Sequence, residues 1–437
     1  MSFQLAGGLF LQFQDGKTAV LSEIFESVAM SGESFHMRIA ILSRGPRLYS
    51  TRRLIEEGCK RGLDIAVLDP LKFGLTIGTD GVEILHRGEP VAFDAAIPRI
   101  GHSITRHGVA LLNQFEQLGL YSANTGDSIR KSRDKLLASQ ILAKNGIRIP
   151  TTAYVRDLYD VETAIERVGG LPCIIKVSEG TQGQGVFLRH TLRESMNLVE
   201  ALLLTGKAVL IQQYIAESHG KDIRALVVGD RVVAAMRRRA RGREFRSNFH
   251  LNGTVESVEL NEEYVNVARR AARVLGLNIA GVDLLEGADG PLVLEVNSSP
   301  GLQGIEAASG VNVAGYIIDF LIKDVDFADV DVGQLLRTNL DQGVLSLHLK
   351  HHPRLVGRSI LELFSLGADI PVFALARGND LLWNPDPELQ LRFDDILICY
   401  GEFTALRQAL KSAIGKGVSP FPVKAIEDQD YEGYNLT

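Results

Sequence analysis

The chain of 437 residues is poor in cysteine and contains no long hydrophobic run. Its three cysteines, Cys59, Cys173 and Cys399, lie far apart and form no CxxC pair, which excludes a disulfide scaffold and argues against a cysteine-rich metal site. This usage is typical of buried free thiols in a reducing cytoplasm, where we expect the protein to act. No apolar segment approaches the roughly 18 residues that span a bilayer, so no membrane insertion is expected.

Positive charge is not in excess either. Lys and Arg number 47 against 53 Asp and Glu, which gives a net charge of −6. Bulk nucleic-acid binding is therefore not expected, because it usually needs a basic surface. Several motifs are also missing: the first strand–helix turn lacks GxGxxG, and the chain has neither GxxxxGK[ST] nor GxSxG. These absences argue against a dinucleotide pocket at that turn, a Walker A loop and an α/β-hydrolase.

Residues 37–124 are predicted to form an open α/β domain. Strand, helix and strand follow one another at 37–42, 49–61 and 64–68, the order that opens a parallel sheet. A further strand at 95–98 and a helix near 108–118 extend the pattern. Residues 1–36 precede it and are interpreted as an N-terminal extension.

Residues 125–324 are predicted to form an α+β domain. One helix, capped by Asp127 or Ser128, is expected to end at Gly146. The strands that follow are expected at 171–177, 208–214, 223–228 and 231–236. A helix at 261–275 and a hairpin formed by IAGVDLL and PLVLEVN complete the domain.

The chain changes character after residue 324. The acidic stretch VDFADVDVG is typical of a linker. A small α/β unit at 338–411 is then predicted, with strands at 344–349, 371–375, 388–392 and 396–399 around a helix at 358–366. Residues 412–437 are interpreted as a tail.

The hairpin carries the clearest chemical signal. Side chains alternate along a strand, so Glu295 and Asn297 share one face. If residues 286–290 form the turn, residue 283 pairs with 293, and Asp283 lies one diagonal step from Glu295 on that face. Two carboxylates and an amide oxygen suit Mg²⁺ or Mn²⁺. The alternative is a solvated polar face, but these residues interrupt apolar strands and two carboxylates would repel each other without a cation.

A lysine followed by glycines gives a second signal. Lys176 stands in the apolar strand LPCIIKV, where a cation is costly unless an anion meets it. Gly180, Gly183 and Gly185 follow it, and glycines allow backbone N–H groups to approach a phosphate. Such loops are often simple turns, so the lysine and the downstream carboxylates strengthen the interpretation. Lys135, on a helix, would alone be read as an exposed lysine.

Basic residues gather between residues 237 and 246. Guanidinium groups suit phosphate and carboxylate, so this stretch is either an anion site or a solvated surface. The histidines 348, 351 and 352 have no further ligand group beside them and are interpreted as surface or packing residues rather than a zinc site. The arginines of this stretch are Arg237, Arg238, Arg239, Arg241, Arg243 and Arg246.

The order of these motifs resembles the ATP-grasp superfamily and, within it, the RimK-type α-L-glutamate ligases. RDK on a helix, IIKxxEGTQGxGV, IQQYI, KDIR, FRSN, AGVDLL and LEVNSSPGL carry the wider resemblance. MRIAILSR, LDPL, IPRIG and SPGLQGIE carry the narrower one. It covers about residues 37–320. It implies a pre-ATP-grasp domain at 37–124 followed by a two-lobed ATP-grasp domain at 125–324.

The resemblance also implies roles for single residues. Lys135 and Lys176 would contact the phosphates of ATP, beneath a lid that contains Gly183 and Gly185. Asp283, Glu295 and Asn297 would hold Mg²⁺. Arg224 and Arg246 would serve catalysis. The remaining nucleotide contacts would come from Gln213 and Tyr214 at the adenine, Asp222 at the ribose, and the segment Arg246, Ser247 and Asn248.

The reaction implied is ATP-dependent amide formation, in which L-glutamate is added to a protein or peptide acceptor through an acylphosphate. Phosphoryl transfer of this kind depends on positioning and electrostatics and needs no side-chain nucleophile. Two alternatives remain: a ligase for another amino acid or a small-molecule acceptor, and a nucleotide-binding regulator of a transport partner.

Residues 338–411 resemble the C-terminal domain of TrkA/RCK potassium-channel regulators. LVGRSILEL, IPVFALARG and FDDILICYG carry this resemblance. It implies a module that binds a small ligand or dimerises, and hence a homo-oligomeric protein.

Overall fold

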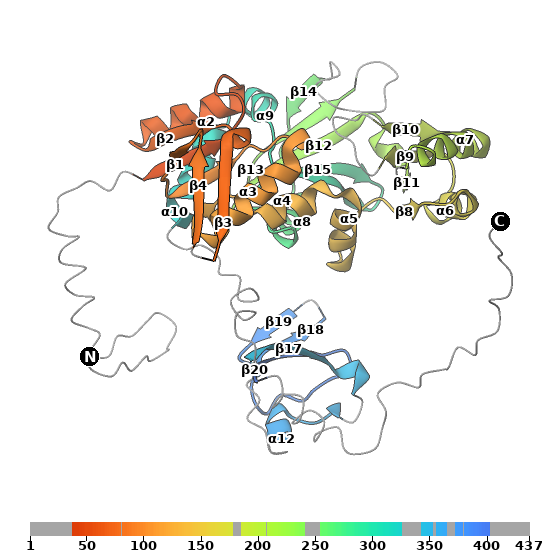
Figure 1. Ribbon diagram of the computed structural model, residues 1–437. Helices are drawn as coiled ribbons and strands as arrows, with labels where there is room; N and C mark the ends of the chain where they lie inside the picture. Colours follow the sequence, from red (N-terminus) through yellow and green to blue (C-terminus); the bar gives the residue numbers. More distant parts are fainter. Residues whose placement is uncertain are drawn as a thin grey trace, which may run out of the picture. The chain divides into compact units, whose positions relative to one another are not determined.

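The computed structural model describes residues 37–79, 81–177, 185–206, 208–240, 254–325, 342–352, 355–364, 372–378 and 380–402. The chain divides into two compact units, residues 1–328 and 329–437 (Figure 1). The predicted extension, 1–36, and the predicted tail, 412–437, lie outside the described residues.

The first unit begins with a parallel four-stranded sheet of order β2-β1-β6-β7. Its central strand is buried because β1 is apolar throughout, with Ile39 and Ile41 fully enclosed. The helices α2 and α3 connect strands of this sheet, as the open α/β prediction requires, although α3 starts at Thr105 rather than near Gly108. The elements are β1 (Arg38–Leu42), α2 (Tyr49–Lys60), β2 (Asp64–Leu68), β6 (Ala95–Pro98), α3 (Thr105–Gln117) and β7 (Tyr121–Ser122).

An antiparallel insertion between β2 and β6 was not predicted. β3 and β4 pair in antiparallel register, from Phe73 opposite His86 to Gly78 opposite Gly81. The insertion consists of η1 (Pro70–Lys72), β3 (Phe73–Gly78), β4 (Gly81–His86) and β5 (Glu89–Pro90).

The single helix predicted from Asp127 or Ser128 to Gly146 is wrong. The structure has α4 (Gly126–Arg133) and α5 (Lys135–Lys144), with Asp134 between them in an extended conformation. The Asp134 carboxylate accepts a hydrogen bond from Leu137 N at 3.0 Å and caps α5. Thr125, not Asp127 or Ser128, caps α4 by accepting from Ser128 N. This break places Lys135 at the start of a helix.

Two antiparallel sheets follow. The smaller, of order β10-β9-β11-β8, is covered by α6 and α7, and the larger, of order β14-β13-β12-β15-β16, is covered by α8 (Figure 1). The smaller group is η3 (Leu158–Asp160), β8 (Thr152–Val155), α6 (Val161–Arg167), β9 (Cys173–Val177), β10 (Val186–Arg189), α7 (Leu192–Leu203) and β11 (Val209–Gln213). The larger is η4 (Ala216–Ser218), β12 (Lys221–Val228), β13 (Arg231–Arg239), β14 (Thr254–Ser257), α8 (Glu262–Val274), β15 (Ile279–Gly287) and β16 (Gly290–Asn297).

Two helices close the unit, α9 (Gln303–Ser309) and α10 (Val313–Asp324). Buried residues of α10, among them Ile317 and Ile318, share one hydrophobic cluster with β1, α2, β12 and β13, so the parallel sheet and the larger antiparallel sheet have a common core. Among the described residues, no single helix is long and apolar enough to cross a membrane. The pair α9 and α10 passes by length and composition, but it is bent by 110°.

The second unit contains an antiparallel sheet of order β17-β20-β18-β19. Arg377 donates to both oxygens of the buried Asp395 carboxylate, at 2.8 and 2.7 Å, and ties β18 to the turn before β20. The prediction of a strand at 388–392 is wrong, and β19 was not predicted. The described elements are β17 (Gln342–His348), η7 (Leu349–His351), α12 (Ile360–Phe364), β18 (Val372–Arg377), β19 (Asp380–Trp383) and β20 (Ile396–Glu402).

Candidate functional site

A cavity of about 650 Å³ lies where the parallel sheet of the first unit and its two antiparallel sheets β10-β9-β11-β8 and β14-β13-β12-β15-β16 converge. Its walls come from the loops after β1 and β6, from the inner faces of β9 and β11, and from the polar face of β12, β13, β15 and β16. Most of the predicted site residues that the structure describes line it: Lys135, Lys176, Gln213, Tyr214, Asp222, Arg224, Asp283, Glu295 and Asn297.

Part of the cavity wall is apolar. Its lining includes Leu142, Ile174, Leu210 and Leu285. Gln213, at the end of β11, is held by the chain before β8: its backbone N–H donates to Thr151 O at 2.8 Å and its Oε1 accepts from Thr151 N at 3.3 Å. The rest of the lining here is Ala138, Ile149, Val186, Val293 and Leu294, beside Tyr214.

Two lysines line the cavity. Lys176 Nζ donates to Gln212 Oε1 at 2.6 Å, and Lys135 Nζ donates to Val177 O at 3.2 Å. Burial lowers the pKa of Lys176 to about 8, although Glu295 opposes this shift and Lys135 adds to it. Burial also lowers the pKa of Lys135. Desolvated ammonium groups that line one cavity favour an anion such as a phosphate. Gln212 was missed, although an amide within the apolar run VLIQQ could have indicated it.

The glycine-rich loop is described only at its end. Gly185 has a φ of +73°, and a Cβ there would lie 2.5 Å from Val177 Cγ2, so both conformation and space require glycine. Gly183 lies outside the described residues. So do Arg241, Arg243, Arg246, Ser247 and Asn248, and their predicted roles stay predictions.

The β12–β13 and β15–β16 strands carry a continuous polar ladder. Arg238 pairs with Asp222, Arg224 pairs with Asp283, and Asp283 pairs with Glu295. The predicted diagonal step between Asp283 and Glu295 is therefore wrong, because the two residues are directly opposite. The register shifts between Asp283 and Leu284, and Leu294 is the extra residue of a β-bulge.

Asp283 is the centre of this ladder and is buried, with 1% exposed. Arg224 donates to its two oxygens at 2.6 and 2.7 Å, and Arg238 Nη2 donates to it at 2.7 Å. Burial alone would raise the pKa of Asp283, but the two guanidinium groups hold it well below its ordinary value. Asp283 therefore remains ionised in this setting.

Glu295 stands opposite Asp283 and is open to solvent through the cavity. Asn297 Nδ2 donates to Glu295 Oε1 at 3.1 Å, which keeps the amide on the same face. The enclosing protein and, next, the Asp283 carboxylate raise the pKa of Glu295. Two carboxylates face to face with an amide beside them form an all-oxygen donor set that fits Mg²⁺.

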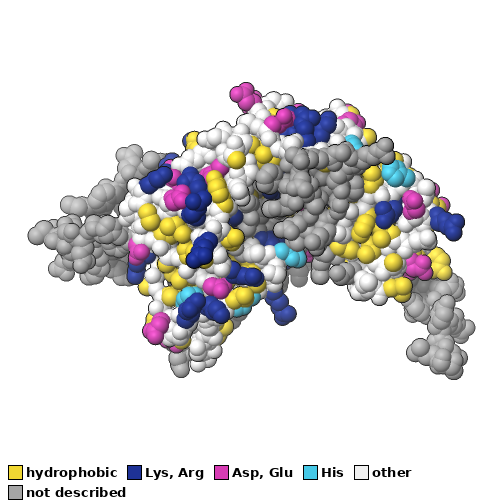
Figure 2. All heavy atoms as spheres, turned by 90° about the horizontal axis from the view of Figure 1, so that it is seen from above, with side chains coloured by type: hydrophobic (Ala, Val, Ile, Leu, Met, Phe, Trp, Pro, Cys, Tyr) yellow, Lys and Arg dark blue, Asp and Glu magenta, His cyan; other side chains and the backbone are white. Residues whose placement is uncertain are grey.

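The basic run divides between the two faces of β13, which continues to Arg239 rather than ending at residue 236. Arg238 faces the cavity and also contacts Asp222. Arg237 instead donates to Glu286 at 2.8 Å, and Arg239 to Glu256 at 2.9 Å. On the face shown in Figure 2, described Lys and Arg side chains lie in separate groups, several of them beside Asp or Glu.

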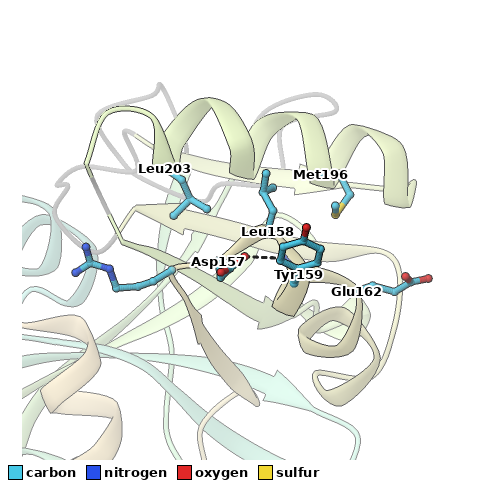
Figure 3. A pocket seen from close by; sticks show the side chains of 7 residues that line it. Asp157, Leu158, Tyr159, Glu162, Met196 and Leu203 are labelled. Carbon is cyan, nitrogen blue, oxygen red and sulfur yellow. Dashed lines mark hydrogen bonds between the residues drawn. The ribbon is translucent and has the colours of Figure 1, made fainter. Parts of the chain in front are cut away.

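A second hollow, of about 620 Å³, lies on the outside of the smaller antiparallel sheet (Figure 3). Tyr159 stands at its rim with 93% of the residue exposed, next to Asp157, whose carboxylate accepts from Tyr159 N at 3.0 Å. Leu158, Met196 and Leu203 supply its apolar lining. None of the predicted site residues lines this hollow.

A parallel α/β sheet, followed by two antiparallel sheets that enclose a lysine- and carboxylate-lined cavity, has the architecture of an ATP-grasp ligase. Residues 37–129 match the RimK PreATP-grasp domain, and residues 132–321 match the RimK-like ATP-grasp domain. The chain belongs to this RimK-like ATP-grasp family. Its activity is that of an ATP-dependent α-L-glutamate ligase.

Similar chains extend along most of the sequence. A probable alpha-L-glutamate ligase of Rhodopirellula baltica is 47% identical over 393 residues, covering 90% of this chain and 97% of its own length. Because this match covers 90% of the chain, it includes at least part of residues 329–437, the second unit. A probable alpha-L-glutamate ligase of Aeromonas salmonicida is 50% identical over 286 residues and covers 65% of this chain and 96% of its own.

Solved structures share the fold. The ATP-grasp ligase PsnB, complexed with a minimal precursor, superimposes with a TM-score of 0.53 at 22% identity, over 66% of this chain and 99% of PsnB. A RimK domain ATP-grasp protein from Sphaerobacter thermophilus gives a TM-score of 0.50 at 23% identity, over 65% of this chain and 99% of that one.

Proposed function

We propose that the enzyme joins L-glutamate to the carboxylate of a protein or peptide acceptor through an acylphosphate. One observation carries the proposal: a single cavity holds two desolvated lysines, a Mg²⁺-type oxygen set and an apolar slot for a base. This arrangement suits transfer of the γ-phosphoryl group to a carboxylate, because that step needs positioned charge rather than a nucleophilic side chain.

The cavity residues take the following roles in this proposal. Lys135 and Lys176 bind the phosphates, while backbone groups at Gln213 and Tyr214 hold the adenine. Asp222 faces the ribose. Arg224 orients Asp283 and stabilises the transferring charge, together with Arg246. Gly183, Gly185, Ser247 and Asn248 complete the enclosure of the phosphates.

Asp283, Glu295 and Asn297 would hold Mg²⁺, or Mn²⁺, in the same proposal. The raised pKa of Glu295 supports this, because burial and the facing Asp283 carboxylate disfavour the charged form more than Arg224 favours it. A bound divalent ion would neutralise negative charge on the transferring phosphoryl group.

Two alternatives predict different results in an assay of ADP release. A ligase for another amino acid or for a small-molecule acceptor would release ADP with a different substrate. A nucleotide-binding regulator would bind ATP without releasing ADP. The retention of both lysines and of the complete oxygen set favours turnover.

Domain limits and location belong to the same proposal. We place the pre-ATP-grasp domain at 37–124, the ATP-grasp domain at 125–324 and an RCK-like C-terminal domain at 338–411, in a cytoplasmic homo-oligomer. The C-terminal domain would bind a small ligand or dimerise. Its edge strand β19 supports a dimer, since Leu381, Leu382 and Trp383 are all exposed, and exposed apolar edges favour pairing with a second chain.

Trapping the acylphosphate tests the reaction. The protein would be incubated with Mg²⁺, ATP, hydroxylamine and a peptide that ends in glutamate, in the absence of free glutamate. We expect a hydroxamate at a peptide carboxyl group and equivalent ADP. ADP without hydroxamate would overturn the acylphosphate, and the Glu295→Ala variant serves as the inactive control.

A further inference from the structure

The parallel sheet of the first domain has a crevice that the proposed nucleotide and metal contacts do not use. In the order β2-β1-β6-β7, the chain leaves β1 toward one side and reaches β6 on the other, so the strand order reverses between β1 and β6. Open α/β sheets bind ligands outside the carboxyl ends of the strands at such a point. Ser43 directly follows β1, Arg99 directly follows β6, and both line the cavity.

Arg99 differs from the other arginines of the cavity. Its Nη2 donates to Pro300 O at 2.8 Å, and within the described parts of the chain no carboxylate lies within 4.0 Å of it. Arg224 and Arg238, in contrast, are both paired with Asp283. Burial, with a smaller contribution from Arg133, lowers the pKa of Arg99 to about 10, so Arg99 is a desolvated cation without a counterion. Its remaining N–H donors are suited to a planar anion.

Ser299 provides an independent sign of a missing ligand. It lines the cavity next to Pro300, and its Oγ is buried with no hydrogen-bond partner among the described residues. A buried hydroxyl without a partner is costly, whereas a ligand oxygen at this position would satisfy it.

This crevice adjoins the proposed metal end of the cavity. A Cβ placed on Gly281 would lie 2.9 Å from Pro300 Cβ and 3.6 Å from Arg224 Nε, so Gly281 lies between Pro300 and Arg224. Arg99, which donates to Pro300 O, is therefore near the group that orients Asp283. Lys135 and Lys176, the residues proposed to bind the phosphates, are not part of this crevice.

We propose that Arg99 and Ser299 form a subsite for one carboxylate of the amino acid that is added, with Ser43 at its edge. This inference rests on the proposed ligase function. A carboxylate held here would hold the amino acid beside the activated acceptor, with its amine free to attack. The acceptor carboxylate that reacts must instead reach the phosphate and metal groups, so it is a different group.

The test measures ADP release with Mg²⁺-ATP, a peptide that ends in glutamate, and varied concentrations of L-glutamate, its α-amide or its γ-amide. For the wild type, we expect the amide that lacks the bound carboxylate to lose about 30-fold or more in kcat/KM, as for a hydrogen bond to a charged group. In Arg99→Gln, KM for L-glutamate should rise by about 10- to 100-fold and the preference over that amide should fall below about 3-fold. KM for ATP should stay within about 2-fold.

Further variants separate binding from folding. Arg99→Lys should recover part of the KM, and Ser299→Ala should raise KM by a smaller factor, about 3- to 10-fold. Arg231→Gln is the matched control, since its side chain is 76% exposed at the turn between β12 and β13. It should behave as the wild type. Unfolding transitions identify any variant that fails to fold.

Two failures are distinguishable. If the wild type turns over L-glutamate while Arg99→Gln and Arg99→Lys keep its KM and its preference over both amides, the subsite is wrong and the ligase function stands. If the wild type releases no ADP with any amino acid, the proposed function itself fails, and the subsite with it.

Discussion

Arg238 joins Asp222 to Asp283 through one guanidinium group. Its Nε donates to Asp222 at 2.6 Å, and its Nη2 donates to Asp283 at 2.7 Å as well as to the second oxygen of Asp222. All three side chains are buried. The proposed ribose contact and the proposed metal ligand are therefore held by the same cation, across three neighbouring strands.

Removal of this cation should have a large effect on stability. In Arg238→Met, two buried carboxylates lose a shared partner, so we expect the free energy of unfolding to fall by about 3–5 kcal/mol. The Mg²⁺ concentration needed for half-maximal nucleotide binding should rise. Urea denaturation and Mg²⁺ titration of bound nucleotide measure the two effects.

Arg239→Met is the matched control, because Arg239 is half-exposed on the opposite face and pairs with Glu256. Exposed ion pairs contribute about 0–1 kcal/mol, so this variant should stay close to the wild type. Equal losses in both variants would contradict the role given to Arg238.

Neutralising Glu295 should abolish turnover without harming the fold. In Glu295→Gln, we expect ADP release to fall by roughly 100-fold or more, since a bound metal ion contributes several kcal/mol to charge stabilisation. Without Mg²⁺, the variant should unfold no earlier than the wild type, because a carboxylate opposite Asp283 has been removed. The stabilisation that Mg²⁺-ATP gives the wild type should be reduced.

Steady-state assays and thermal unfolding with and without Mg²⁺-ATP measure both properties. Glu259→Gln, at an exposed position between β14 and α8, is the control. A fully active Glu295→Gln enzyme would remove Glu295 from the metal set.

Nucleotide capture should weaken as Lys176 loses its proton. Because its pKa is about 8 in the free protein, kcat/KM for ATP should fall as pH rises through about 8 and should be insensitive to this group at lower pH. Lys176→Arg keeps a cation at all these pH values, so the fall in kcat/KM near pH 8 should be absent from its pH profile. The two pH profiles are compared in the same buffers. A fall in kcat/KM of equal size at the same pH in the arginine variant would show that another group causes it.

Removal of the second unit tests the proposed dimer. Deletion of residues 338–437 should lower the number of subunits per particle, and so should Trp383→Lys, which places a charge on the exposed edge strand β19. Light scattering after size exclusion gives this number as the particle mass divided by the mass of one chain. Glu388→Lys, also exposed in this unit, should leave it unchanged. An unchanged number of subunits and unchanged kinetics after the deletion would contradict both proposed roles of the unit.

Regular periodicity made much of the fold predictable. The strand Asp64–Leu68 and the strand Ala95–Pro98 were predicted with their observed bounds. The helix break at Asp134 was not predicted. Apolar residues continue at helical spacing on both sides of it, and the cap by the Asp134 side chain is recognisable only from the extended backbone at that residue. The β3–β4 hairpin was also missed.

The candidate site was predictable in composition but not in register. Alternation places Glu295 and Asn297 on one face, and their hydrogen bond agrees with that. The bulge at Leu294 has no signature in a period-two pattern, so the direct pairing of Asp283 with Glu295 was out of reach. Arg238 was one of several arginines in the sequence, and only the register of β12 with β13 separates it from Arg237 and Arg239.

ADP release with Mg²⁺-ATP across a panel of amino acids, with mass spectrometry of the products, is the decisive assay of the glutamate ligase function. We expect turnover that depends on L-glutamate, together with products that grow by glutamyl units, and loss of both in Glu295→Gln. Tight ATP binding with no ADP release on any amino acid, with a glutamate-ending peptide present, would contradict this function.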